Sequence, residues 1–253
     1  MNLLIKSAII IESNNLLHNK QQDLLIENGI ITKIDTTIKN DQGYDEVSLE
    51  NLHVSCGWFD TSVSFGEPGY EERETIINGL STAAKSGFTA VAVNPNTTPK
   101  IDNKAAVEFL INKGTSSATS LYPIGNITKN AEGADMAEMY DMQNSGAIAF
   151  SDYNSPIANA NLTKVALLYA QNFDGLVLSF PQDNSIARDG LVNEGETSTL
   201  LGLKGVPSLA EELQISRDLF LLEYTGGKLH IPTISTAKSV QLIAQAKVKG
   251  LDV

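Results

Sequence analysis

A regular alternation of apolar strands and amphipathic helices is the feature that most constrains this chain of 253 residues. Strands separated by helices of this length form βα units, and such units build a parallel sheet. The expected strands are residues 52–60, 88–96, 118–126, 147–152, 175–180 and 228–235, with a further one beginning at Leu251. The expected helices are residues 72–87, 104–114, 134–146, 161–173, 208–227 and 236–250.

Two architectures fit six full strands and the start of a seventh. A (β/α) barrel closes only with eight strands, so in a barrel this chain would end partway round. An open, doubly wound sheet would be complete with the strands present. The alternation alone leaves both architectures open.

The first fifty residues follow a different pattern, with short strands at residues 3–11 and 23–35. Asn28-Gly29 separates two apolar runs, which is typical of a two-residue β-hairpin turn. We therefore expect two domains, a small β-domain over residues 1–50 and an α/β domain over residues 51–253.

Charge and residue counts exclude several classes of function. The formal net charge is −12, without the clusters of Lys and Arg that nucleic-acid binding requires. No apolar run reaches the length of about 18 residues expected of a membrane span. The only cysteine, Cys56, cannot form an internal disulfide, which favours a reducing cytoplasm. The chain has only three histidines, few for a histidine-based metal centre.

Six segments, in chain order, carry motifs that resemble one known family. They are the strands ending in residues 27–34, residues 56–60 with 66–69, 94–99, 149–152, 193–196 with 200–203, and 230–236. Together they resemble the dihydroorotase family of the amidohydrolase superfamily. The resemblance implies a TIM-type (β/α)8 barrel of the metal-dependent hydrolase type, with strands one to about six or seven in this chain and incomplete at the C-terminal end. It also implies that the N-terminal part forms a small β-sandwich domain.

Members of that family hydrolyse or close a cyclic amide with one or two divalent metal ions, usually zinc, which activate a bound water. The positions that align with the family's metal ligands carry other residues here. They are Ser62 and Ser64 (a His-x-His pair in the family), Tyr153 after Asp152 (an Asp-Asp pair), Phe180 (His) and Thr233 (His). Gly66 stands where the family has the arginine that grips the substrate carboxylate. The resemblance therefore implies vestigial metal and arginine positions, no bound metal or other cofactor, and no catalytic residue.

Three other features have both a functional and a structural interpretation. Asn96 aligns with a family residue that contacts the substrate, and a proline-flanked Asn is also a common turn former. Ser62 or Ser64 would be a nucleophile only with a hydrogen-bonded base such as His230; otherwise the serines fill a vacated pocket and the histidine is an interior residue. The long polar loop at residues 183–207 would lie on the catalytic face of a barrel.

We therefore expect a pseudoenzyme related to pyrimidine biosynthesis. Inactive relatives serve as structural partners of aspartate carbamoyltransferase, so the resemblance implies that enzyme as a partner, and barrels of this family often form homodimers. Two alternatives remain. One is an active cyclic-amide hydrolase with a relocated or partner-supplied site, and the other is a small-molecule binding module lined by Asn96 and the 183–207 loop.

Overall fold

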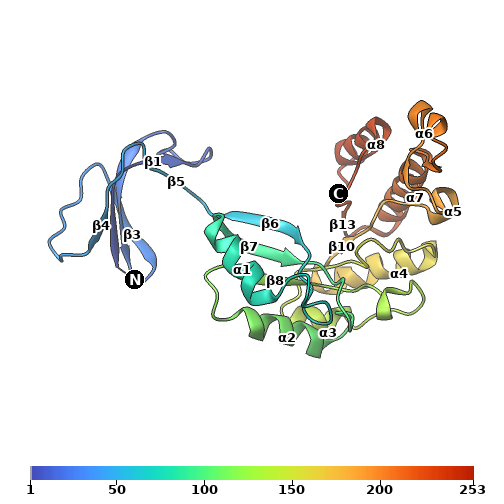
Figure 1. The fold of residues 1–253 in the computed structure, drawn as a ribbon, viewed down its shortest axis with the longest axis horizontal. Helices are drawn as coiled ribbons and strands as arrows, with labels where there is room; N and C mark the ends of the chain where they lie inside the picture. The colour runs from blue at the N-terminus through green and yellow to red at the C-terminus, as the bar shows by residue number, and fades with distance from the viewer. Residues whose placement is uncertain (1) are drawn as a thin grey trace. The chain divides into compact units, whose positions relative to one another are not determined.

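The computed structural model describes residues 2–253 and divides into two compact units, one ending at Trp58 and one spanning Phe59–Val253 (Figure 1). The sequence pattern changes at residue 51, whereas the boundary between the two compact units of the structure follows Trp58. The expected strand at residues 52–60 is in fact two strands, β5 (His53–Ser55) and β6 (Trp58–Val63). They separate because β5 pairs with β1 in one sheet and β6 joins the sheet of the second unit.

The first unit is a single five-stranded sheet. Its strands are β1 (Leu3–Ile11), β2 (Gln21–Glu27), β3 (Ile30–Asp35), β4 (Asp45–Val47) and β5, in the order β3-β2-β1-β4, with β5 also pairing with β1. Asn28 and Gly29 form the expected hairpin turn, with φ of 53° and 80°. Positive φ at both turn positions matches the right-handed twist of the flanking strands. A β-sandwich requires a second sheet packed against the first. The expected β-sandwich domain therefore stays a prediction.

The second unit is a curled parallel sheet whose strand order is β13-β10-β9-β8-β7-β6 (Figure 1). The order follows the chain without a reversal, whereas a doubly wound sheet reverses at its switch point. This is part of a (β/α) barrel, as the first of the two architectures predicts. Its strands are β6, β7 (Phe88–Val93), β8 (Ser120–Gly125), β9 (Ala149–Phe150), β10 (Leu176–Leu178) and β13 (Lys228–His230).

Helices alternate with these strands, mostly where the sequence predicts them. They are α1 (Ile76–Lys85), α2 (Lys104–Gly114), α3 (Met139–Asn144), α4 (Ala160–Ala170), α7 (Leu209–Thr225) and α8 (Ala237–Val248). The region between β10 and α7 adds two short helices, α5 (Asn184–Ala187) and α6 (Glu196–Leu200), and a small ladder of β11 (Val192–Asn193) and β12 (Gly205–Val206). After α8, the backbone carbonyl of Asp252 accepts a hydrogen bond of 3.0 Å from the N–H of Leu229. This contact lies beside β13, where the sequence predicts the next strand.

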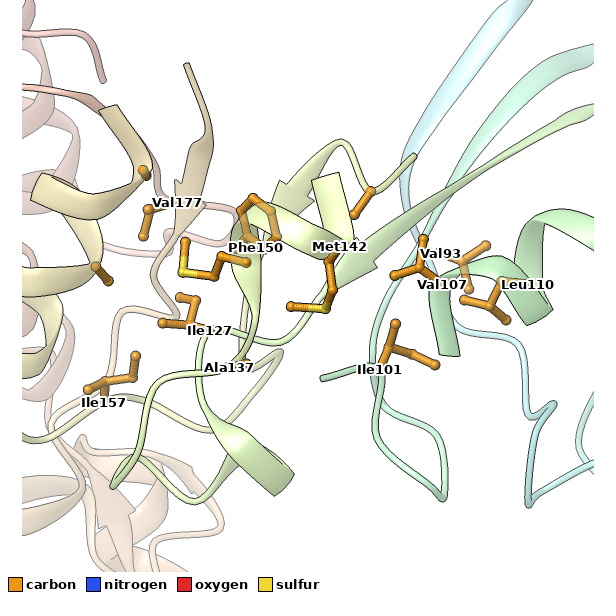
Figure 2. Packing of buried hydrophobic residues seen from close by; sticks show 14 of the residues in the cluster. Val93, Ile101, Val107, Leu110, Ile127, Ala137, Met142, Phe150, Ile157 and Val177 are labelled. Atoms are coloured by element: carbon orange, nitrogen blue, oxygen red, sulfur yellow. The ribbon is translucent and has the colours of Figure 1, made fainter. Parts of the chain in front are cut away.

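Strand alternation separates two apolar layers. Val93, Phe150 and Val177 point to the helix side and belong to the main core, which Figure 2 shows with Phe150 and Met142 near its centre. Other positions of strands β7 to β10 point to the opposite, concave side and form a second cluster of Ala92, Ile124, Ala149 and Leu178. Successive strand residues face opposite sides of a sheet, so one set of strands supplies both layers. No helix within residues 2–253 is long and apolar enough to cross a membrane.

Candidate functional site

A cavity of about 360 Å³ lies on the concave side of the sheet and reaches the carboxyl ends of its strands. Parallel strands end at the same edge, so the residues that follow them converge there. Each of the six strands contributes to the lining. The lining residues are Phe59, Thr61, Ser62, Ala92, Asn94, Ile124, Ile148, Ala149, Ser151, Tyr153, Asn154, Leu176, Leu178, Phe180, His230, Pro232 and Thr233.

A chain of hydrogen bonds joins the two predicted serines to residues from other strands. The side-chain amide of Asn94 donates to the hydroxyl of Ser62 at 3.1 Å and to the hydroxyl of Ser64 at 3.4 Å. Ser64 in turn donates to the phenolic oxygen of Tyr153 at 3.4 Å. We call Ser62, Asn94, Ser64 and Tyr153 the hydroxyl chain. The sequence interpretation gave Asn94 no role, although its place at the end of β7 was a usable signal.

Tyr153 occupies its place in the hydroxyl chain through an unusual backbone conformation. Its φ is 56°, in the left-handed region that residues with a side chain rarely adopt. Its backbone N–H donates to the hydroxyl of Ser151 at 3.0 Å. The sharp turn after β9 therefore directs a phenol into the cavity, at the position that the sequence interpretation aligned with a family carboxylate.

Asp152, the retained member of the predicted carboxylate pair, is 4% exposed and does not line this cavity. Its carboxylate accepts hydrogen bonds from the backbone N–H groups of Ile127 (2.9 Å) and Thr128 (3.0 Å), from the Thr128 hydroxyl and from the Asn126 side chain (3.4 Å). Burial raises the pKa of Asp152, and these hydrogen bonds oppose that rise. The side chain ties the end of β9 to the loop after β8, which is a structural role.

Phe180, Thr233 and His230 come from the ends of the last two strands and line the cavity. His230 remains accessible at the wall, yet partial desolvation lowers the pKa of its imidazole, and the positive charge of Lys247 lowers it further. Within residues 2–253 no hydrogen bond joins the His230 side chain to Ser62 or Ser64. The nucleophile–base pair that the sequence left open is therefore not assembled.

Gly66, which the sequence interpretation aligned with the family's arginine, lies in a tight turn. Its N–H donates to the carbonyl of Glu74 at 2.9 Å, and its carbonyl accepts from the N–H of Tyr70 at 2.8 Å. A Cβ atom at position 66 would lie 1.8 Å from the Tyr70 carbonyl oxygen. This backbone has no room for a side chain, so an arginine would not fit at this position without rebuilding the loop.

Asn96 and the 183–207 loop do not line the strand-end cavity, contrary to the binding-module hypothesis. The side-chain oxygen of Asn96 is buried without a hydrogen-bond partner. The loop lines a second cavity of about 360 Å³, which also borders Phe180 and Thr233. A substrate contact at Asn96 stays a prediction.

Comparison with solved structures gives the class of the fold. An L-hydantoinase from Arthrobacter aurescens superimposes with a TM-score of 0.79 at 17% identity, and the match covers 100% of this chain and 57% of the hydantoinase. A D-hydantoinase superimposes with a TM-score of 0.75 at 20% identity over 100% of this chain and 56% of the other. The chain therefore shares the fold of these hydantoinases over part of their length.

Sequence comparison gives the family. Residues 53–239 match the model of the family described as dihydro-orotase-like, and this chain belongs to that family. A dihydroorotase from Pelotomaculum thermopropionicum is 40% identical over 255 residues, covering 100% of this chain and 59% of the relative. A dihydroorotase from Acetivibrio thermocellus is 42% identical over 236 residues, and the match covers 93% of this chain and 55% of that relative. The chain thus spans less than two thirds of the length of these relatives.

The residues present do not fit the zinc that the family uses. Zinc in proteins is held by imidazole, thiolate or carboxylate groups. Within residues 2–253 no group of three or more His, Cys, Asp or Glu side chains is placed to hold a metal ion. Among the described residues that line the cavity, His230 alone carries a group of these types, and the carboxylate of Asp152 is already hydrogen-bonded within the protein.

Substitution of Gly66 tests the geometry of the turn. We expect Gly66→Ala to lower the free energy of unfolding by at least ~2 kcal/mol, because the backbone must move to admit the Cβ atom. Gly195→Ala is the matched control, since no heavy atom lies within 4 Å of its Cβ position and its backbone is extended. Urea denaturation of both variants is the measurement. Equal effects of the two substitutions would contradict the described turn.

Substitution of Asp152 tests its structural role. We expect Asp152→Ala to lower the free energy of unfolding by about 3 kcal/mol, because buried N–H groups of Ile127 and Thr128 lose their acceptor. Asp152→Asn keeps an acceptor oxygen and similar volume, so its loss should be clearly smaller. Thermal and urea unfolding measure both changes. If the alanine variant is as stable as the original protein, the carboxylate does not hold the two loops together.

Proposed function

We propose that this chain is a catalytically silent member of the dihydroorotase family, related to pyrimidine biosynthesis. The observation that carries the proposal is the hydroxyl chain, which occupies the strand ends where the family has metal ligands. The aligned positions at Phe180 and Thr233 add a phenyl ring and a fourth neutral hydroxyl.

The chemistry of these groups supports the proposal. A neutral hydroxyl is a poor zinc ligand beside imidazole or thiolate. Without a bound metal, the family's activated water and polarised carbonyl are both lost. Gly66 removes the bidentate hydrogen bonds that an arginine makes to a carboxylate, and its turn leaves no space for a replacement.

The test is turnover of dihydroorotate by the protein as its gene encodes it, with and without added zinc. We expect no ring opening or closure above the uncatalysed rate under either condition. The dihydroorotase of Pelotomaculum thermopropionicum, assayed in parallel, is the positive control. Turnover that rises with zinc and disappears with a chelator would overturn the proposal in favour of an active hydrolase with a relocated site.

We also propose that the protein acts as a structural partner of aspartate carbamoyltransferase, as the family resemblance implies. Sedimentation velocity of that enzyme with and without this protein is the test, and we expect a faster-sedimenting complex at micromolar concentrations. The protein alone, in the same experiment, should sediment as a homodimer. Unchanged sedimentation of the enzyme at these concentrations would contradict the partnership.

A further inference from the structure

The chain contains two Asn-Gly sequences, and the fold places them in opposite environments. Asn28-Gly29 forms the hairpin turn between β2 and β3, where both residues are exposed. Asn78-Gly79 lies inside α1, where Gly79 is buried. In an Asn-Gly pair the glycine nitrogen reaches the asparagine side-chain amide easily, because glycine has no Cβ atom to hinder the approach. The two pairs therefore share their chemistry and differ in their structure.

The reacting groups of the hairpin turn are free of hydrogen bonds within residues 2–253. Neither the Asn28 side-chain amide nor the Gly29 N–H makes one there. The backbone N–H of Asn28 donates to the side-chain oxygen of Asn2 at 2.8 Å, which leaves the Asn28 side chain unengaged. No heavy atom lies within 4 Å of a Cβ position at Gly29. The Asn28 side chain can therefore change rotamer, and water reaches both residues.

The same groups are held in place in α1. The side-chain nitrogen of Asn78 donates to the two carboxylate oxygens of Glu74, at 2.9 and 3.2 Å. The N–H of Gly79 donates to the carbonyl of Thr75 at 2.9 Å. A Cβ atom at Gly79 would lie 2.3 Å from the ring of Phe65, so this side of the helix is tightly packed. The Gly79 nitrogen can attack only after the helix opens locally, and the free energy of opening slows the reaction.

We propose that Asn28 is a site of spontaneous deamidation and that Asn78 is protected from the same reaction. The Gly29 nitrogen bonds to the side-chain carbonyl carbon of Asn28, and the carbon–nitrogen bond of the side-chain amide breaks. The proton lost by Gly29 leaves with that nitrogen as ammonia. Water then opens the cyclic imide at either of its carbonyl groups. The products are aspartate and isoaspartate, and in isoaspartate the main chain runs through the side-chain carbon.

The products change the edge of the first sheet. β3 lies at that edge, next to β2. Either product adds a negative charge directly after Glu27 in the sequence. Isoaspartate also lengthens the turn, whose two residues set the register between Glu27 and Ile30. Both changes lie in the first unit, so they are independent of the strand-end site and of the proposed function.

Peptide mapping measures the reaction at both sites in one sample. Trypsin releases residues 21–33 and 74–85, and each peptide contains a single Asn, at 28 and 78 respectively. The protein as its gene encodes it is incubated in mildly alkaline, oxygen-18-labelled water and digested at intervals. We expect the Asn28 peptide to gain the mass of deamidation, with one labelled oxygen, at least ~10-fold faster than the Asn78 peptide. That ratio corresponds to about 1.4 kcal/mol of opening free energy.

Two controls separate the effect of the fold from that of the sequence. In urea both Asn-Gly pairs lie in an unfolded chain, so their rates should agree within about 3-fold. Asn28→Gly removes the reacting amide and keeps a residue that tolerates positive φ. Its peptide should show no gain, whereas a gain there would assign the reaction to Gln21 or Gln22 and overturn the inference.

Two further results would also overturn it. One is no gain at Asn28 in the folded protein while the urea sample reacts, because the turn would then protect its own asparagine. The other is equal rates at Asn28 and Asn78 in the folded protein, because the helix would then give no protection. Neither result bears on dihydroorotate turnover, so failure of this inference and failure of the proposed function are distinguishable.

Discussion

Convergence of parallel strands at one edge of the sheet is the constraint on which the site depends. Because β6, β7, β9, β10 and β13 all end there, residues far apart in sequence, such as Ser62 and Tyr153, meet through Asn94. In (β/α) barrels the same convergence builds active sites at the carboxyl ends of the strands. Here it assembles neutral hydroxyls and an amide.

Two titratable groups near this edge, Asp152 and His230, are bonded or desolvated by their surroundings. Asp152 lies in the protein interior, where four donors bind its carboxylate and fix the loop after β8. Desolvation favours the neutral form of His230. At Gly66, the carbonyl oxygen of Tyr70 lies where a side chain would begin.

The sequence predicted the βα units well because their signal is local: apolar strands alternate with amphipathic helices. The alternation left the barrel and the open sheet both possible, and the barrel followed from the family resemblance. The sequence predicted the Asn28-Gly29 turn because that signal is local too. It failed where long-range pairing decides the outcome. The strand expected at residues 52–60 divides because β5 pairs with β1. The bridging role of Asn94 and the left-handed backbone of Tyr153 depend on neighbours from other strands, which periodicity does not reveal.

The central claim is that the strand ends of this chain do not hold a divalent cation. Crystals grown with excess zinc, with diffraction measured on both sides of the zinc absorption edge, test it most directly. The account predicts no anomalous peak at the strand ends. An ordered peak about 2.0–2.3 Å from a side-chain atom of Ser62, Asp152 or His230 would contradict it, because those distances are typical of zinc coordination.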